Sequence, residues 1–209
     1  MTLILTVLTV FLILVASEWW WRRRKTHGEV SRKFIHITVG SFAAFWPLFL
    51  DWWQILLLSA AFIVVVLVSR YFGIFRTIHT VERPTWGEVY FALAVGGLAL
   101  LTHNNAIYAA ALLHMGLADG LAAIIGVRYG AHNSYKVLGH TKSIAGTLTF
   151  LFCSMIILIV YATVTPHLIA PVILVALAIV ATALENVSVR GLDNIVVPAV
   201  VAIALHLVS

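Results

Sequence analysis

The chain has 209 residues, of which 62% are apolar and only 10% are charged, whereas a soluble domain averages about 45–50% apolar and about 25% charged residues. This composition excludes a disordered chain and a soluble globular domain, because so few charges cannot cover so much apolar surface, and the single cysteine, Cys153, excludes a disulfide-stabilised scaffold. The net charge of +5 does not indicate nucleic-acid binding, since the cations lie at the ends of apolar runs rather than in a basic module.

Long apolar runs follow one another along the whole chain. A helix needs about 20 mostly apolar residues to cross a membrane, and helices are the default spanning element because an open sheet edge is not viable in lipid. We therefore predict an all-α, polytopic membrane helical bundle of about eight transmembrane helices, forming a single integral membrane domain over residues 1–209. The predicted spans are Thr2–Trp21, Ser31–Leu50, Trp52–Tyr71, Gly87–Leu101, Asn105–Gly126, Ile144–Thr163, His167–Leu184 and Asp193–Val208.

The first span is predicted to be a retained anchor rather than a cleaved signal peptide. A signal peptide carries its cations before the apolar run, whereas the basic run 22–25 of this chain follows the span and the three tryptophans 19–21. Tryptophan is typical of the membrane interface. We therefore divide the domain into an anchor helix with a basic cluster over residues 1–25 and a catalytic helical bundle over residues 26–209.

The cations also predict the orientation of the chain. With eight spans and the N-terminus outside, all 13 lysines and arginines fall in inner loops, as the positive-inside rule requires. Among the acids, only Asp51 falls outside. We therefore expect both termini outside, a multi-pass location in the cytoplasmic membrane (the endoplasmic reticulum membrane if the source is eukaryotic), and a site that faces the cytosol.

The first polar segment on the expected inner side contains Glu29, Arg32, Lys33, His36 and Gly40. At 3.6 residues per turn, these residues share one face of a helix. A carboxylate, two cations and an imidazole on one face could bind a ligand that carries phosphate. Alternatively, Arg32 and Lys33 only orient the helix, with Glu29 paired to Lys33 one turn away. His36, one turn deeper on the same face, favours the functional interpretation.

Asp119 lies deep within an otherwise apolar span. A carboxylate at this depth costs roughly 2.5–3.5 kcal/mol on insertion scales, so it normally faces a partner, a metal or a watery cavity. To stay ionised it needs a nearby cation, and the expected partners are Arg128, Lys142 or a metal shared with Glu185 or Asp193. Close helix packing is the alternative role of the same stripe, because its other members are small: Gly116, Gly120, Ala123, Gly126 and Gly130.

A loop from Arg128 to Lys142 leads into the next span, where Ser143, Gly146 and Thr147 mark the expected start of a helix. A helix N-terminus offers free N–H groups and a partial positive charge, which suit a phosphate. The Lys-Ser pair precedes Gly146, so the segment is not a Walker motif. Ser143 could equally cap the helix.

Two further acids flank the loop between the last two spans. Glu185 ends its helix, where the helix dipole disfavours an anion, so we expect a cation or a metal beside it. Asp193 begins the next helix, where a capping role explains it as well as a functional one. His114, within the same span as Asp119, is predicted to be a buried, hydrogen-bonded histidine.

Taken together, these motifs resemble the polyprenol kinase family, which includes dolichol kinase, phytol kinase and the CTP-dependent diacylglycerol kinase and is related to the phosphatidate cytidylyltransferases. In family order, the matching motifs are Glu29…Arg32-Lys33…His36…Gly40, Thr85-Trp86-Gly87-Glu88…Tyr90-Phe91, Asp119…Ala122…Gly126…Gly130, Lys142-Ser143…Gly146-Thr147…Phe150 and Leu192-Asp193-Asn194…Pro198. The resemblance implies transfer of the γ-phosphoryl group of a nucleotide, usually CTP, to a lipid alcohol such as a polyprenol, phytol or diacylglycerol, with Mg²⁺ or another divalent cation.

The resemblance assigns expected roles to the inner-face residues. The expected catalytic residues are Asp119, Glu29 and His36. The expected metal ligands are Asp119, Glu185 and Asp193. The expected nucleotide-binding and phosphate-binding residues are Arg32, Lys33, Lys136, Lys142, Ser143, Gly146, Thr147, Gly126 and Gly130. Arg83, Glu88 and Asn194 are further candidates on the same side.

The sequence departs from the family pattern at two places. Ala118 stands where members often carry a glycine before the aspartate, and Gly139-His140-Thr141 is an unusual sequence in its loop. One alternative function is a phosphatidate cytidylyltransferase that makes a CDP-lipid, although the Gly-rich run of that branch near its C-terminus is missing. A second alternative is an ion-coupled transporter, although we find no internal repeat and no polar pathway in the outer half. The oligomeric state is not predicted.

Overall fold

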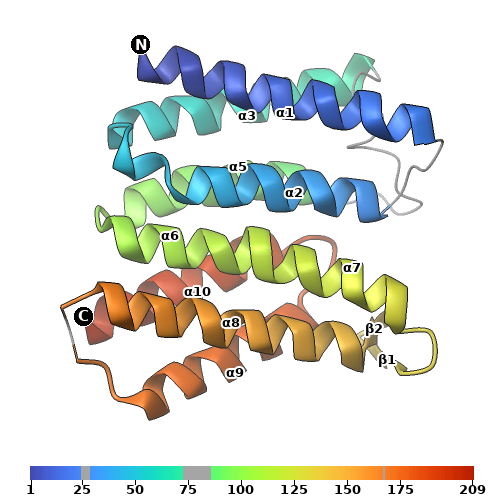
Figure 1. Cartoon of the computed structure of the whole chain (residues 1–209), viewed down its shortest axis with the longest axis vertical. Coiled ribbons are helices and arrows are strands. Elements are labelled where there is room, and N and C mark those ends of the chain that lie inside the picture. Colours follow the sequence, from blue (N-terminus) through green and yellow to red (C-terminus); the bar gives the residue numbers. More distant parts are fainter. Residues whose placement is uncertain (25–28, 73–85, 167) are drawn as a thin grey trace.

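The computed structural model describes residues 1–24, 29–72, 86–166 and 168–209, and it is mostly helical (Figure 1). Every apolar run that was predicted to be a span forms a helix. A π-helical turn, η2 (His114–Ala118), joins α6 to α7 into one continuous helix, and a 3-10 turn, η1 (Trp46–Leu48), follows α2. The helices are α1 Thr2–Arg24, α2 Glu29–Ala44, α3 Trp52–Phe72, α5 Gly87–Leu101, α6 Asn105–Leu113, α7 Asp119–Tyr129, α8 Ile144–Val164, α9 Pro171–Val187 and α10 Asp193–Val208.

Prolines account for the two largest differences between predicted and observed helix boundaries. The predicted span Ser31–Leu50 is α-helical only to Ala44, and Pro47 lies in the 3-10 turn that follows, because proline disfavours the helical conformation in the residue before it. Helix α9 begins at Pro171. Proline is favoured in the first turn of a helix, where its missing N–H group would have no partner in any case.

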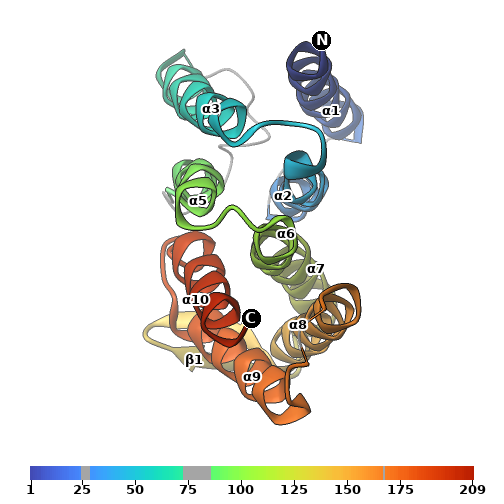
Figure 2. The same cartoon turned by 90° about the vertical axis from the view of Figure 1, so that its left-hand side faces the viewer.

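The helices stack in two columns that run side by side along the long axis of the molecule. Viewed along the helices, α3, α5, α10 and α9 form one column and α1, α2, α6–α7 and α8 form the other (Figure 2). Contacts between successive members hold each column together, and the pairs α8–α9 and α10–α6 join the two columns. Both termini lie at the same end of the bundle (Figure 1).

Four helical segments are long and apolar enough to cross a membrane: Thr2–Trp21, Trp52–Ser69, Asn105–Tyr129 and Ile144–Val164. Helices α5, α9 and α10 are apolar but shorter. Large apolar side chains such as Phe11, Leu148 and Phe152 are exposed on the outer surface. An exposed apolar surface of this extent indicates a membrane protein.

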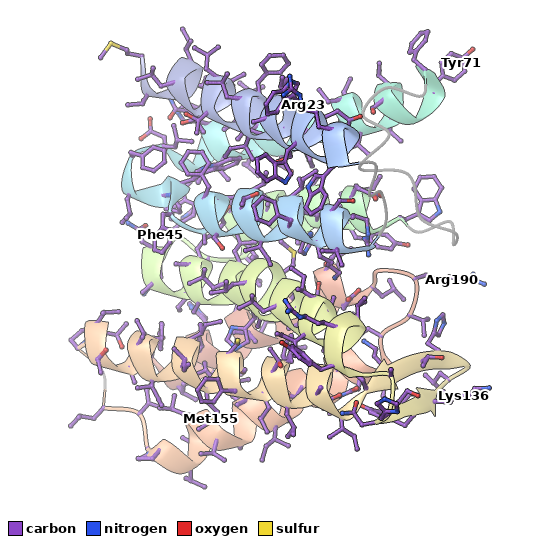
Figure 3. All side chains as sticks on the ribbon, turned by 45° about the vertical axis from the view of Figure 1, so that its right-hand side comes forward. Arg23, Phe45, Tyr71, Lys136, Met155 and Arg190 are labelled. Atoms are coloured by element: carbon purple, nitrogen blue, oxygen red, sulfur yellow. The ribbon has the colours of Figure 1, made fainter. Side chains whose placement is uncertain are left out.

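The described cations concentrate at the end of the bundle opposite the termini. Figure 3 shows Lys136 and Arg190 at this end, together with Tyr71 at the end of α3, whereas Phe45 lies toward the other end. Lys33 and Lys142 belong to this end as well. Lys33 lies near the start of α2, and Lys142 lies near the end of the strand that leads into α8. The bundle therefore has one basic end and one end with few charges among the described residues.

Glycines allow the central helices to approach one another closely. A Cβ atom at Gly40 of α2 would lie 2.9 Å from the Cα of Gly116, and a Cβ at Gly146 of α8 would lie 3.4 Å from the Cα of Gly126. The predicted small-residue stripe is therefore divided between two neighbours, because Gly116 and Gly120 face α2 whereas Gly126 faces α8. Contacts of this kind require a residue without a side chain.

An antiparallel hairpin corrects the all-α prediction. Strand β1 (Ser134–Val137) pairs with β2 (His140–Ser143), with Tyr135 opposite Lys142. The two turn residues between the strands, Leu138 and Gly139, both have positive φ, as a two-residue turn that matches the twist of a hairpin requires. The unusual Gly139-His140-Thr141 sequence is therefore part of this hairpin, which leads directly into α8.

Candidate functional site

Asp119 follows the π-helical turn and lies where α7 packs against α2. The Asp119 N–H group donates to the carbonyls of Gly116, three residues earlier, and His114, five residues earlier, rather than to the residue four back. Turns of this kind occur often at functional sites. The Asp119 side chain is buried and accepts a hydrogen bond from the Lys33 ammonium, which is equally buried. The expected cation partner of Asp119 was Arg128, Lys142 or a metal, and the structure assigns Lys33 to this position instead.

His36 lies one turn further along α2, on the same side of the helix as Lys33. Its Nε2 atom is 3.0 Å from the carbonyl oxygen of Met115 and 3.6 Å from a carboxylate oxygen of Asp119. Because a carbonyl oxygen can only accept a hydrogen bond, Nε2 carries a proton, and in the neutral ring Nδ1 is then an acceptor. Phe91 contacts the ring edge-on and limits its orientation.

Glu185 and Lys142 form a second buried ion pair close to the first. Glu185 lies near the end of α9, and the Lys142 ammonium at the end of β2 donates to its carboxylate and, over 3.1 Å, to its carbonyl oxygen. Burial by itself would lower the pKa of Lys142, but the neighbouring Glu185 carboxylate outweighs this effect and raises it. Lys142 is therefore charged at neutral pH, as expected for a cation beside a helix C-terminus.

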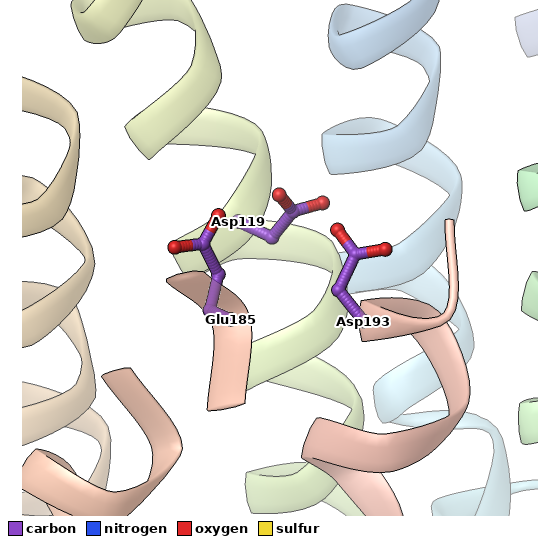
Figure 4. Close-up of side chains that lie close together, drawn as sticks. All are labelled: Asp119, Glu185 and Asp193. Carbon is purple, nitrogen blue, oxygen red and sulfur yellow. The ribbon is translucent and has the colours of Figure 1, made fainter. Parts of the chain in front are cut away.

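The carboxylates of Asp119, Glu185 and Asp193 converge at this point. Figure 4 shows the three side chains, from α7, α9 and the start of α10, directed toward one another. One oxygen of each lies within 4.8 Å of the others. Asp119 and Glu185 are buried and Asp193 is half-buried. Three carboxylates at this spacing repel one another unless cations lie among them.

The donor set of this acidic cluster fits a divalent metal ion. Carboxylate oxygens are the ligands that Mg²⁺ prefers, and the cluster offers one from each of three acids. Asn194, the residue after Asp193, donates through its side-chain nitrogen to the carbonyl of Gly87 over 2.8 Å. Its Oδ1 is buried with no hydrogen-bond partner among the described residues.

A small cavity lies on the other side of His36, between α1, α2 and α5. Its polar walls are Arg32, His36 and Glu88, and its apolar walls include Phe91. Gly87, whose carbonyl is bound by Asn194, also lines it. The cavity and the acidic cluster are therefore adjacent, with His36 and the Gly87–Asn194 contact between them.

A comparison with known proteins identifies the family of the chain. The chain is 33% identical over 176 residues to phytol kinase from Synechocystis sp. (strain PCC 6803), an alignment that covers 81% of this chain and 75% of that protein. The chain belongs to the polyprenol and phytol kinase family. No protein-family model and no solved structure matches it.

Several residues expected to bind phosphate have structural partners in this family member. Ser143 accepts a hydrogen bond from the Gly146 N–H over 3.1 Å and so caps α8. Thr147 bonds to Tyr135 and, over 3.0 Å, to Asn186. Gly126 and Gly146 pack against each other, and a Cβ at Gly130 would meet Ser143. These contacts favour packing for the three glycines and a capping role for Ser143.

The hairpin places Lys136 and Lys142, two of the three lysines expected to bind phosphate, on opposite faces. In a strand, residues directly opposite each other lie on the same face, so Lys142 and Tyr135 face the bundle whereas Lys136 lies on the exposed face. Glu29 begins α2, but its side chain lies outside the described residues, as does Arg83.

Tyr135 and Asn186 help to hold the site together and were not predicted from the sequence. Tyr135 donates to Asn186 over 2.6 Å and contacts Thr147, so the hairpin is attached to α8 and α9. The sequence offers one signal, the position of Asn186 next to Glu185, and it offers none for Tyr135. His114 was predicted to be buried and hydrogen-bonded, which is confirmed: it bonds to the Ala110 carbonyl and to Ser154, each over 2.8 Å.

Proposed function

We propose that this protein is an integral membrane kinase that transfers the γ-phosphoryl group of a nucleotide, CTP in the first instance, to the hydroxyl of a lipid alcohol. The observation that supports this function best is the cluster of Asp119, Glu185 and Asp193 beside a cavity lined by α1, α2, α3 and α5. The family relationship to a phytol kinase supports an isoprenoid alcohol as the substrate. A polyprenol or a diacylglycerol remains the alternative acceptor.

Phosphoryl transfer depends on positioning and charge neutralisation more than on covalent chemistry. We propose that His36 accepts the proton of the lipid hydroxyl at Nδ1, since its Nε2–H is held by the Met115 carbonyl. The Asp119 carboxylate, 3.6 Å from Nε2, would stabilise the imidazolium that results. Arg32 at the cavity wall would bind phosphate oxygens, and the partial positive charge at the N-terminus of α8 would favour them.

The acidic cluster is the proposed site of a divalent cation, Mg²⁺ in the first instance. Asp119, Glu185 and Asp193 would hold it, and when bound it would offset the negative charge of the nucleotide phosphates. Lys33 and Lys142 keep Asp119 and Glu185 ionised and oriented, because each ammonium bonds directly to its carboxylate.

The orientation proposed for the bundle is eight membrane crossings with both termini outside and the basic end in the cytosol. The support is the concentration of cations at one end and of both termini at the other. Cysteines in a Cys153→Ser background test it. A thiol reagent that cannot cross the membrane should label Ala131→Cys, beside the hairpin, only from the cytosolic side and Leu168→Cys, at the opposite end, only from outside. The reverse pattern would overturn the orientation.

Nucleotide labelled at either the γ-phosphate or the α-phosphate tests the activity. Purified protein in mixed micelles is given CTP, ATP, GTP or UTP together with phytol, a polyprenol or diacylglycerol. We expect γ-label in the lipid, most with CTP and phytol, and none with α-label. Transfer of α-label to phosphatidate would instead identify a cytidylyltransferase. Nucleotide-independent solute uptake into proteoliposomes would identify a transporter.

A matched pair of variants serves as the control for this assay. Asp119→Asn removes a carboxylate of the acidic cluster, whereas Asp51→Asn makes the same chemical change at the opposite, exposed end of the bundle. The proposal requires that transfer is lost in the first variant and kept in the second.

A further inference from the structure

A second, larger cavity lies above the first, between the two columns of helices. Its volume is about 170 Å³, compared with about 40 Å³ for the first cavity. Val10 and Phe11 of α1 line one side, Ala61 and Val65 of α3 the other, and Ala92 of α5 the floor. The exposed side chains of Phe11 and Val65 are among its walls, so the cavity opens laterally toward the surrounding lipid.

The walls of this cavity are hydrocarbon. Its hydroxyl groups are turned away into backbone hydrogen bonds: Thr6 donates to the Thr2 carbonyl over 2.9 Å, and Ser59 donates to the Ala92 carbonyl over 2.7 Å. The cavity therefore suits an apolar chain, since a polar ligand would lose its hydrogen bonds to water without replacement.

The two cavities share part of their lining. Leu14, Val39, Phe62 and Phe91 line both. From the lipid-facing mouth between α1 and α3, the walls are first apolar and then, beyond Phe62 and Phe91, include Arg32, His36 and Glu88. A ligand that followed this path would have a long apolar part and one polar end.

From this continuity we infer that the larger cavity binds the hydrocarbon tail of the lipid alcohol, with the hydroxyl at the polar end beside His36. This inference rests on the proposed function for the identity of the ligand. It makes α1 and α3 a substrate-binding wall, and it commits the tail to enter from the bilayer between them rather than from the side of α8 and α9.

A variant with a narrower cavity tests the inference, because it should prefer a shorter alcohol substrate to a longer one. Ala60 and Ala61 are adjacent, exposed residues of α3, but only Ala61 lines the cavity. In the Ala61→Phe variant, kcat/KM for phytol should fall about tenfold relative to the shorter alcohol geraniol. Ala60→Phe should keep the wild-type ratio, and the nucleotide KM should stay the same in both.

The facing wall offers an independent pair of variants. Val10→Phe narrows the cavity from α1, whereas Leu12→Phe changes an exposed α1 residue that does not line it. The inference is supported if Val10→Phe lowers the ratio of kcat/KM for phytol to kcat/KM for geraniol and Leu12→Phe leaves that ratio unchanged. If all four variants phosphorylate phytol and geraniol in the wild-type ratio, the tail does not occupy this cavity, although the kinase activity itself would stand.

A photoreactive long-chain alcohol separates this inference from the proposed function. Its crosslinks to wild-type protein are mapped by mass spectrometry, with and without excess phytol. Labels on α1 and α3 residues of the cavity that phytol suppresses support a tail site, even if no phosphoryl transfer is found. Labels on other helices, or labels in the cavity that phytol does not suppress, would show that ordinary membrane lipid occupies it and would overturn the inference.

Discussion

The half of the bundle around α6–α7 and the half around α1 and α3 are both apolar in sequence, but they are packed in opposite ways. In the segment Asn105–Tyr129, 56% of the most apolar window is buried, compared with 22% in the windows of α1 and of α3. The buried segment carries Asp119 and packs through glycines, whereas α1 and α3 lie across an apolar cavity. Close packing is therefore found where charges must be held, and looser packing where the neighbour is hydrocarbon.

The largest expected effect comes from Asp119 in the packed half. Asp119→Asn should lower kcat/KM by about 10²–10³-fold. It should also lower the free energy of unfolding by about 3–5 kcal/mol, because the buried Lys33 ammonium loses its partner. Lipid kinase assays and thermal unfolding in micelles measure the two effects.

The double variant Lys33→Met/Asp119→Asn separates chemistry from folding. With neither charge left in the apolar interior, we expect most of the lost stability to return while activity stays absent. Recovery of activity in the double variant would show that Asp119 serves only to neutralise Lys33. The proposed role of Asp119 in the reaction would then be wrong.

Glu185→Gln should have a smaller effect on stability than Asp119→Asn, because Lys142 is more exposed than Lys33 and can reach water. We expect a loss of about 1.5–3 kcal/mol, typical of a hydrogen bond to a charged group. Activity should fall about 10²-fold, and more Mg²⁺ should be needed for half-maximal activity. A magnesium titration that matches wild type would remove Glu185 from the proposed metal site.

Substitutions of Gly40 and Gly97 test how closely the two halves of the bundle are packed, without changing a charged residue of the site. Gly40→Ala places a methyl group 2.9 Å from the Cα of Gly116 and should destabilise the protein by about 1–3 kcal/mol. Gly97→Ala in α5 meets nothing within 4 Å and should stabilise the helix by about 0.5–1 kcal/mol. Equal effects in denaturant unfolding would show that the central helices are not closely packed.

The smallest effect is expected at Ser143. Ser143→Ala removes the cap of α8 and should cost about 1 kcal/mol of stability, with little change in the nucleotide KM. Ser143→Asp should restore the cap, yet raise that KM because its charge repels phosphate at the helix start. An unchanged KM in both variants would move the nucleotide away from this helix.

The sequence was sufficient for the helices because long apolar runs leave few other structures in a membrane. It also singled out Asp119, Glu185 and Asp193, which lie far apart in the chain, and the structure brings them together. The hairpin was missed, because strands of four mostly polar residues have no distinct pattern and this one is held by the contact of Tyr135 with Asn186.

The partners of the charges could not be predicted from the sequence. Lys33 was expected to face phosphates because it shares a helical face with Arg32 and His36. In the structure, one side of that face meets α7 and the other side lines the small cavity. Lys33 turns to Asp119, whereas Arg32 lines the cavity. Helical periodicity shows which residues lie together on a helix, whereas only packing decides which neighbour each of them meets.

The π-helical turn at His114–Ala118 has a consequence for the rotation of the helix that follows it. Each residue of an α-helix advances about 100° around the axis, and a π-turn accommodates one additional residue. If the same residues formed a regular α-helix, Asp119 and everything after it would turn about 100° relative to α6 and away from Lys33. Deleting a single residue within Met115–Ala118 would instead make Asp119 the fourth residue after His114, restore a regular helix and keep α7 in its present rotation. The phase of α7, and with it the meeting of the three carboxylates, is set by one extra residue in one turn.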